Sequence, residues 1–318
     1  MIKPRILFMG TPRFAVPALA LLVESGYPLA GVVTQPDKPQ GRGRALQPSA
    51  VKAFALSGNL PVVQPQQARD IDFLQTLRQL EPDLIALAAF GQILPKEILN
   101  LPPMGCLNIH PSILPKYRGA APINWAIING EKITGVTIMQ MVEEPDAGDI
   151  FLQEELSIGP EEKYDQLHDR LSQLGAELLV KTVEMIMKGT AHGIAQDGSA
   201  ATYAPRLKKE NGLIRWDDEA AKIVNLIRGL SSYPGAYTFL DGKKLKVFGA
   251  KAEAASPDKS PGTISVQKGM GFIVASGNGC VRLLDVQLEN KKRMLAEDFL
   301  RGFHVRPGSV LRPTPYDA

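Results

Sequence analysis

The fold is indicated by a short apolar run at residues 84–89, with the sequence LIALAA. Amphipathic stretches that suit helices, such as Val16–Ser25 and Ile71–Leu80, occur between this run and others like it. Uninterrupted apolar strands that alternate with helices are typical of a parallel sheet covered on both faces. We therefore expect an α/β fold, with a Rossmann-like, mostly parallel sheet and helices on both faces. The other expected strands of this sheet are Ile6–Met9, Leu29–Val33, Pro61–Val63 and Cys106–Ile109.

Composition narrows the class of protein. The 318 residues are 44% hydrophobic and 22% charged, which is ordinary for a globular protein and argues against wholesale disorder. The apolar runs are far shorter than the roughly 20 residues that a membrane helix needs, and the N-terminus lacks a signal-peptide pattern. Two cysteines and four scattered histidines form no metal-ligand motif. We expect a cytoplasmic protein without a metal, and a monomer by default.

The sequence pattern changes after Gly189. Residues 190–207 show neither helical nor strand periodicity and suit a linker. Short strands bounded by turn residues follow, and the clearest hairpin signal is Asp241-Gly242. We therefore expect one domain at residues 1–189 and a small OB-like β-barrel domain at residues 208–318. The strands expected in the barrel are Ala236–Leu240, Leu245–Phe248, Thr263–Val266, Phe272–Ala275 and Val281–Val286.

The net charge of +3 is the average of two unlike parts. Residues 1–205 contain 17 Lys and Arg against 21 Asp and Glu, which gives −4. Residues 206–318 contain 19 against 12, which gives +7. A basic barrel is consistent with nucleic-acid binding, but surface charge without a partner explains the same numbers equally well.

Candidate catalytic residues lie at the end of the strand expected at Cys106–Ile109. Asn108 and His110 alternate there with apolar residues, so a period of two places both polar side chains on one face. Open α/β folds bind their ligands at the carboxyl ends of such strands. An imidazole and an amide can together move a proton and stabilise the oxyanion formed by addition to a carbonyl. Taken alone, the pair also fits a polar strand end with a structural histidine.

An acidic loop follows the next expected strand, with four carboxylates within residues 143–149. One of these carboxylates could meet His110, orient its ring and stabilise its charged form. Asp146 is the carboxylate that turn residues hold best, although spacing alone does not select it over Glu144 or Asp149.

No complete hydrolase or nucleotide-binding motif accompanies these residues. Ser112 lacks the GxSxG nucleophile elbow. Gly10 opens the first strand–helix turn without completing GxGxxG, and Gly41-Arg-Gly lacks a Walker lysine. Binding of a nicotinamide cofactor or a nucleoside triphosphate is therefore not supported.

Residues 108–149 read NIHPSILPKYRGAAPINWAIINGEKITGVTIMQMVEEPDAGD, which resembles the 10-formyltetrahydrofolate-dependent formyltransferases. Asn108, His110 and Asp146 match the catalytic Asn-His-Asp set of that family one for one. The opening FMGTPRFA, the loop TQPDKPQGRGRALQPS and the basic C-terminal part are similar to the branch of the family that acts on methionyl-tRNA. Pro111 stands where glycine is usual in that branch, and proline is familiar there in related transformylases.

This resemblance implies transfer of the formyl group of 10-formyltetrahydrofolate to the α-amine of initiator methionyl-tRNA. The products would be tetrahydrofolate and N-formylmethionyl-tRNA, which is used in translation initiation. Asn108 would stabilise the oxyanion, His110 would share in this and assist proton transfer, and Asp146 would orient His110. The residues implied to line the folate pocket are Phe90, Gly91, Gln92 and Ile93, together with Ser112, Ile113, Leu114 and Pro115.

The resemblance also implies that tRNA is bound by the basic loop at Gln35–Ser49 and by the basic barrel. A loop of this length without periodicity is usually functional or disordered. Trp125 and Trp216 are expected to be packing residues. The residues expected to contact tRNA phosphates or base edges are Lys38, Arg42, Arg44, Lys243, Lys244, Lys246, Lys291, Lys292 and Arg293.

Three alternative functions fit part of this pattern. A sugar-amine or nucleotide formyltransferase and a formyltetrahydrofolate hydrolase would use the same catalytic set, but neither requires the basic loop or the basic second domain. A tRNA-binding protein on an inactive scaffold would leave the Asn-His-Asp set without a purpose.

Overall fold

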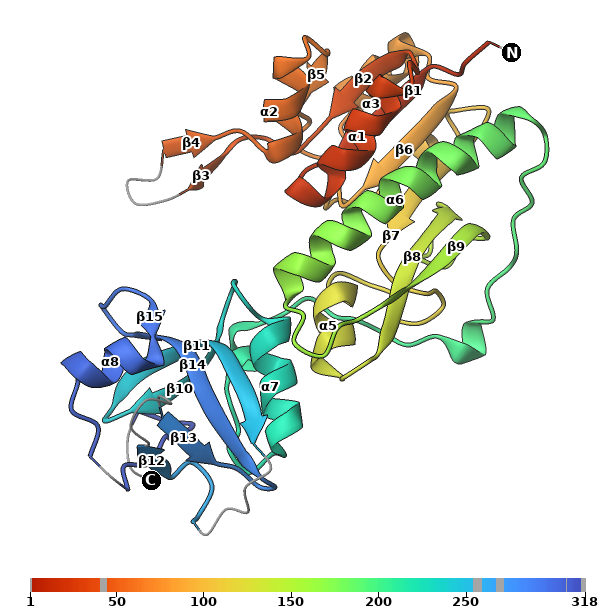
Figure 1. Cartoon of the computed structure of the whole chain (residues 1–318). Helices are drawn as coiled ribbons and strands as arrows, with labels where there is room; N and C mark the ends of the chain where they lie inside the picture. The colour runs from red at the N-terminus through yellow and green to blue at the C-terminus, as the bar shows by residue number, and fades with distance from the viewer. Residues whose placement is uncertain (1, 41–44, 254–258, 267–271, 307, 316–318) are drawn as a thin grey trace. The chain divides into compact units, whose positions relative to one another are not determined.

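The computed structural model describes residues 2–40, 45–253, 259–266, 272–306 and 308–315. The chain forms two compact units (Figure 1). The first unit contains Met1–Pro122, Ile133–Ser157 and His168–Pro205, and the second contains Ile123–Lys132, Ile158–Leu167 and Arg206–Ala318. The second unit therefore includes two short segments of the region 1–189, which we expected to form one domain.

A seven-stranded sheet with the order β5-β2-β1-β6-β7-β8-β9 forms the centre of the first unit. The strands from β5 to β7 are parallel to one another, whereas β8 and β9 extend the sheet in antiparallel direction. The expected mostly parallel sheet is confirmed, but β9 was not expected because none of its residues is buried and half of them are polar. The strands are β1 (Ile6–Gly10), β2 (Leu29–Val33), β5 (Val62–Val63), β6 (Leu84–Ala88), β7 (Cys106–His110), β8 (Ile133–Gln140) and β9 (Ile150–Ser157).

Helices cover both faces of this sheet (Figure 1). On one face lie α1 (Val16–Glu24) and α6 (Tyr164–Met187), and Gly175 of α6 contacts Ile109 of β7. On the other face, α3 (Ile71–Leu80) and α4 (Lys96–Leu99) pack against apolar strand residues that include Cys106. The remaining helices of the chain are α2 (Ala50–Ser57), α5 (Pro122–Ile128), α7 (Ala220–Gly229), α8 (Ala296–Gly302) and three 3-10 turns at Arg13–Ala15, Gly198–Ala200 and Lys209–Gly212.

The loop expected at Gln35–Ser49 contains a β-hairpin, so the expectation of an irregular loop was wrong. Strand β3 (Lys38–Gln40) pairs antiparallel with β4 (Ala45–Gln47), and Figure 1 shows this hairpin extending away from the sheet. All three β4 residues are exposed, so no burial-driven alternation of apolar and polar residues marked the strand in the sequence.

The second unit contains an antiparallel sheet with the order β10-β11-β14-β13-β12, and β15 pairs with β14. The segment near the C-terminus joins its two edges. Phe239 of β10 exchanges two main-chain hydrogen bonds of 3.0 Å with Arg312, and the Ile264 nitrogen of β12 donates to the Ser309 oxygen at 2.8 Å. The expected separate, strand-rich domain is confirmed. Its strands are β10 (Ala236–Leu240), β11 (Lys243–Glu253), β12 (Ile264–Val266), β13 (Phe272–Ala275), β14 (Cys280–Leu288) and β15 (Met294–Leu295).

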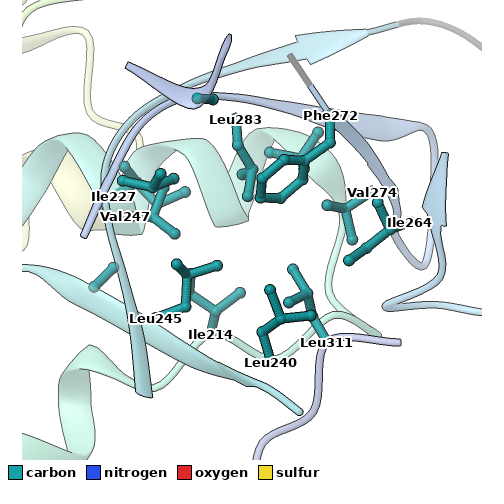
Figure 2. Close-up of a cluster of buried hydrophobic side chains, with 14 of the residues drawn as sticks. Ile214, Ile227, Leu240, Leu245, Val247, Ile264, Phe272, Val274, Leu283 and Leu311 are labelled. Atoms are coloured by element: carbon teal, nitrogen blue, oxygen red, sulfur yellow. The ribbon is translucent and has the colours of Figure 1, made fainter. Parts of the chain in front are cut away.

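One hydrophobic cluster fills the second unit (Figure 2). Figure 2 shows the strand residues Leu245 and Phe272 pointing inward together with Leu311 of the C-terminal segment. Helix α7 contributes Ile223 and Ile227, which are both 1% exposed. This helix was not expected, although its apolar residues recur at a helical spacing.

Residues 190–207, which we expected to be a linker, form main-chain pairs with the first unit. Ile194 forms a β-bridge with Ile150 of β9, and Tyr203 forms one with Arg118. These pairings use main-chain groups, which the pattern of side chains does not reveal. Among the residues described above, no helix combines the length and the apolar character needed to cross a membrane.

Candidate active site

Strand β7 presents its two polar residues on one face of the sheet. Cys106, Asn108 and His110 share a face by alternation, and Cys106 packs there among residues of α3 and α4. Ile109 lies on the opposite face, against Gly175 of α6. Asn108 is 8% exposed and His110 is 3% exposed. The expected period of two therefore places an amide and an imidazole two residues apart in a buried position.

Two neighbouring groups fix the ring of His110. Its Nε2 lies 2.9 Å from the main-chain oxygen of Tyr117. Because a carbonyl oxygen only accepts hydrogen bonds, Nε2 carries the hydrogen of this pair. The Nδ1 atom lies 3.5 Å from Oδ1 of Asp146. Nδ1 is therefore the ring atom that faces the carboxylate.

The tertiary structure distinguishes Asp146 from the other carboxylates of the acidic loop. Its side chain is only 16% exposed, and its Oδ2 accepts a hydrogen bond of 2.8 Å from the Gly119 nitrogen. The side chain of Glu144 is 71% exposed and pairs with Arg118, and Asp149 is exposed. Asp146 is thus the carboxylate that faces the imidazole.

The backbone at the site adopts left-handed conformations at Tyr117 (φ +62°), Gly119 (φ +118°) and Asp146 (φ +56°). Such a conformation costs a residue other than glycine about 1 kcal/mol or more, so surrounding hydrogen bonds must hold it. A Cβ at Gly119 would lie 2.8 Å from the oxygen of Ala204, so a larger residue does not fit there. The turn at 117–119 holds both candidate residues, His110 through a main-chain oxygen and Asp146 through a main-chain nitrogen.

The amide of Asn108 is unused within the part of the chain that the structure describes, where it has no hydrogen-bond partner. Its backbone is held rigidly, because Asn108 pairs with Leu87 of β6 on one side and with Met139 of β8 on the other. A fixed amide with unused donors can bind an oxyanion with little reorganisation.

The first expected folate segment follows β6. The Phe90 oxygen already accepts a hydrogen bond of 3.0 Å from Gln35. Gln92 uses both ends of its amide to hold residues 66–68. Ile93 is 79% exposed and presents an apolar side chain at the surface. The structure therefore gives Gln92 an internal structural contact and leaves Ile93 accessible.

The second expected folate segment is tied to β8. The Thr137 hydroxyl donates to the Ser112 oxygen at 2.7 Å and accepts from the Leu114 nitrogen at 3.2 Å. Ser112 and Leu114 are 0% and 2% exposed, so their side chains belong to the interior. Ile113 and Pro115, which are half-buried, are the members of this segment left to face a ligand.

Sequence reasoning missed Thr137 and its neighbour Gln153 of β9. The Gln153 amide donates to the Thr137 hydroxyl at 2.7 Å and to the Leu114 oxygen at 3.0 Å. Thr137 is directly opposite His110 in the strand register. A polar residue within the apolar run of β8 was the available signal, but its partner became evident only from the register.

The basic residues expected to bind tRNA differ in their surroundings. Arg42 and Arg44 lie outside the described residues, and Lys38 of β3 contacts the side-chain oxygen of Gln35. In the barrel, the Lys244 ammonium lies 3.8 Å from the centre of the Tyr237 ring. The Lys246 ammonium donates to a main-chain oxygen at 2.9 Å. Three exposed lysines have no ion-pair partner within the described ranges, namely Lys243, Lys291 and Lys292.

Arg293, also expected to contact tRNA, has a carboxylate partner within the second unit. Its Nε lies 2.9 and 3.0 Å from the two carboxylate oxygens of Asp285, and its guanidinium lies 4.3 Å from the centre of the Phe248 ring. The hydrogen bonds to Asp285 raise the pKa of Arg293 above its ordinary value. A guanidinium that a carboxylate already satisfies is poorly placed to bind a phosphate.

Cys106 lies on the same strand as Asn108 and His110. Burial raises the pKa of the Cys106 thiol to about 12, so this residue packs and does not act as a nucleophile. Within the described part of the chain, no group of three or more His, Cys, Asp and Glu side chains is arranged to hold a metal ion. Catalysis without a metal stays a prediction.

The fold and the site together define an α/β enzyme for addition to a carbonyl, followed by a strand-rich domain. Residues 4–183 match the family model described as formyl transferase, and residues 206–304 match the model of the formyl transferase C-terminal domain. The chain therefore belongs to the formyl transferase family, and the resemblance noted in the sequence is confirmed.

Several relatives named methionyl-tRNA formyltransferase are similar to the chain over nearly its whole length. The protein of Syntrophus aciditrophicus is 55% identical over 98% of this chain and 100% of its own length. That of Geobacter metallireducens is 50% identical over 95% of this chain and 97% of its own length. That of Bacillus subtilis is 48% identical over 96% and 97%, respectively.

Solved structures of more distant proteins share the fold. The sugar 3N-formyl transferase WlaRD, solved with dTDP and 5-N-formyl-THF, has a TM-score of 0.68 at 20% identity and covers 92% of this chain and 100% of its own. HypX from Aquifex aeolicus, solved with tetrahydrofolic acid, has a TM-score of 0.65 at 20% identity and covers 94% of this chain and 47% of its own.

Proposed function

We propose that this chain transfers the formyl group of 10-formyltetrahydrofolate to the α-amino group of initiator methionyl-tRNA. The products are tetrahydrofolate and N-formylmethionyl-tRNA, which is used in translation initiation. One observation carries the proposal. Asn108 and His110 at the end of β7 stand with Asp146 of the acidic loop after β8, in a chain that is 55% identical to a methionyl-tRNA formyltransferase over 98% of its length.

In the proposed reaction, the amine nitrogen bonds to the formyl carbon, and the bond from that carbon to N10 of the folate breaks. The tetrahedral intermediate carries an oxyanion that the Asn108 amide would bind, and loss of one such donor typically costs about 3–4 kcal/mol. His110 Nδ1 and Asp146, 3.5 Å apart, would take up the proton that the amine nitrogen loses and return one to the leaving nitrogen.

The folate is proposed to bind between the two segments implied by the sequence. Ile93 and Ile113 would provide apolar contacts to its ring, supported by the exposure of Ile93. Phe90, Gly91, Gln92, Ser112, Leu114 and Pro115 would shape the pocket mainly through the backbone. Thr137 and Gln153 would keep the second segment in place through their hydrogen bonds.

The tRNA is proposed to bind through phosphate contacts from the basic barrel and through the basic segment Gln35–Ser49. Lys243, Lys291 and Lys292 are the strongest candidates in the barrel, because they are exposed and not neutralised by a described carboxylate. Lys38, Arg42 and Arg44 would contact the acceptor end.

The two expected domains are proposed to have different roles. Residues 1–189 would form the catalytic domain and residues 208–318 the tRNA-binding domain. Residues 190–207 join the two in sequence, although they also pair with the first unit. The cytoplasmic location and the monomeric state stay predictions.

The decisive experiment offers labelled 10-formyltetrahydrofolate to the full chain with methionyl-tRNA, with free methionine, or in buffer alone. Label on methionyl-tRNA only is the expected result. Release of label as formate in buffer would favour a hydrolase, and transfer to free methionine at an equal rate would argue against recognition of tRNA. Transfer to a sugar amine in place of methionyl-tRNA would favour a small-molecule formyltransferase.

The catalytic assignment is tested by Asn108→Ala, for which a kcat about 100- to 1000-fold below that of the wild type is expected. The matched control is Asn100→Ala, because Asn100 is an exposed asparagine at the end of α4. Unchanged thermal unfolding of both variants would separate catalysis from folding. Near-normal turnover of Asn108→Ala would overturn the role given to Asn108.

A further inference from the structure

Residues 194–204 pair with Ile150 of β9 and with the turn at Tyr117 and Arg118 in the first unit. Ile194 exchanges two main-chain hydrogen bonds with Ile150, of 2.8 and 2.9 Å. The main-chain nitrogen of Arg118 donates to the Thr202 oxygen at 2.9 Å, and its main-chain oxygen accepts from the Ala204 nitrogen at 2.7 Å. The Tyr117 nitrogen donates to the Thr202 hydroxyl at 2.9 Å. The segment therefore supports the same turn that holds His110 and Asp146.

Gln196 makes the side-chain contact between this segment and the acidic loop. Its Nε2 donates to the main-chain oxygens of Asp146 at 2.9 Å and of Gly148 at 2.7 Å. Its Oε1 accepts from Arg118 at 2.8 and 3.2 Å. Arg118 has only donors and the two main-chain oxygens are only acceptors, so the orientation of the amide is determined. Both donors and both lone pairs of the Gln196 side chain are used.

We infer that Gln196 is a positioning residue for Asp146, and this inference rests on the proposed function. Asp146 has a left-handed backbone with φ +56°, which needs support from its surroundings. Gln196 binds the backbone of the acidic loop at Asp146 and again two residues later, and it links both points to Arg118. Arg118 is 6% exposed, so the other end of the link is anchored in the interior.

Two substitutions of Gln196 would disrupt its hydrogen bonds in different ways. Gln196→Ala removes every bond of the side chain and frees the loop. Gln196→Glu has nearly the same shape and keeps an acceptor for Arg118, but it replaces the donor to the two main-chain oxygens with a third acceptor. Glutamate would therefore repel the backbone at Asp146 while it keeps the pair with Arg118, so both substitutions should displace the carboxylate.

The link acts on Asp146 and not on substrate, so its loss should lower kcat and leave KM nearly unchanged. We expect kcat of Gln196→Ala and Gln196→Glu to fall about 10- to 100-fold, because a misplacement of about 1 Å in a catalytic group has an effect of this order. The KM values for 10-formyltetrahydrofolate and methionyl-tRNA should stay within about twofold. The control is Gln173→Ala, because Gln173 is exposed on α6 and bonds to Glu177 of the same helix.

A double-mutant cycle with Asp146→Asn separates positioning of the carboxylate from general support of the fold. In the Asp146→Asn background, Gln196→Ala should lower kcat by less than about twofold, because the effects of interacting substitutions are not additive. The inference would be overturned if Gln196→Ala lowered kcat by the same factor in the wild type and in Asp146→Asn. It would also be overturned if Gln196→Ala and Gln196→Glu both kept the wild-type kcat. The same assay separates it from the proposed function, because absence of formyl transfer by the wild type would refute that function instead.

Discussion

Gly148 provides a direct test of the idea that the acidic loop places Asp146 at His110. A Cβ built on Gly148 would lie 1.9 Å from the main-chain oxygen of Gln140, whereas ordinary contact begins at 3.4 Å. The Gln140 backbone has little freedom to yield, because its nitrogen donates to the Asp149 oxygen at 2.8 Å. In Gly148→Ala the loop must therefore move by about 1.5 Å, which is the difference between the two distances.

This displacement sets the expected size of the effect. A shift of about 1 Å in a catalytic group lowers the rate by roughly 100-fold, so kcat of Gly148→Ala should fall by at least that factor. Overpacking of this kind also destabilises a protein by about 1–3 kcal/mol. For a unit of this size each kcal/mol lowers Tm by roughly 2–4 °C, so Tm should fall by several degrees.

The assay measures transfer of labelled formyl to methionyl-tRNA, and calorimetry or circular dichroism measures Tm. Gly198→Ala is the matched control, because a Cβ at Gly198 meets no atom within 4 Å. Gly198→Ala should keep the wild-type kcat, with Tm unchanged or slightly higher. The reasoning is refuted if Gly148→Ala turns over like the wild type, or if both alanine variants lose activity equally.

Two further predictions concern electrostatics. The pKa of Cys106 is raised from 9.0 to about 12 in the folded protein, so its contribution to stability is complete below pH about 9. The free energy of unfolding should then fall by about 1.4 kcal/mol per pH unit between these pKa values, relative to Cys106→Ala in urea titrations. Lys292→Ala should reduce the salt dependence of tRNA affinity by about one unit of log–log slope. Arg293→Ala should lower Tm and leave that slope unchanged, because Arg293 is bound to Asp285; equal slopes for both variants would contradict this distinction.

Local sequence patterns anticipated most of the parallel sheet because its strands are buried on both faces. Strands β1 and β6 are buried throughout and consist of apolar residues, whereas the equally buried β7 also contains Asn108 and His110. The placement of Asn108 and His110 on one face followed from the period of a strand in the same way. Strands β4 and β9 are largely exposed, so burial imposed no such pattern on them.

The residues that hold His110 and Asp146 in place were not visible in the sequence. Tyr117 holds His110 through a main-chain oxygen, and Gly119 holds Asp146 through a main-chain nitrogen. Gln196 lies 50 residues from Asp146 along the chain. Main-chain groups are the same in every residue, and glutamine is common on protein surfaces, so neither produced a sequence signal.

The sequence by itself therefore determined the mostly parallel fold, the family and the placement of an amide and an imidazole on one face of a strand. These features depend on side-chain type and on periods of a few residues. Only the tertiary structure selected Asp146 over Glu144 and Asp149. It also paired Arg293 with Asp285, and it brought residues 194–204 into hydrogen-bond contact with Ile150 and Arg118. Each of these depends on which distant groups come within hydrogen-bond distance, and that is set by the packing of the whole unit.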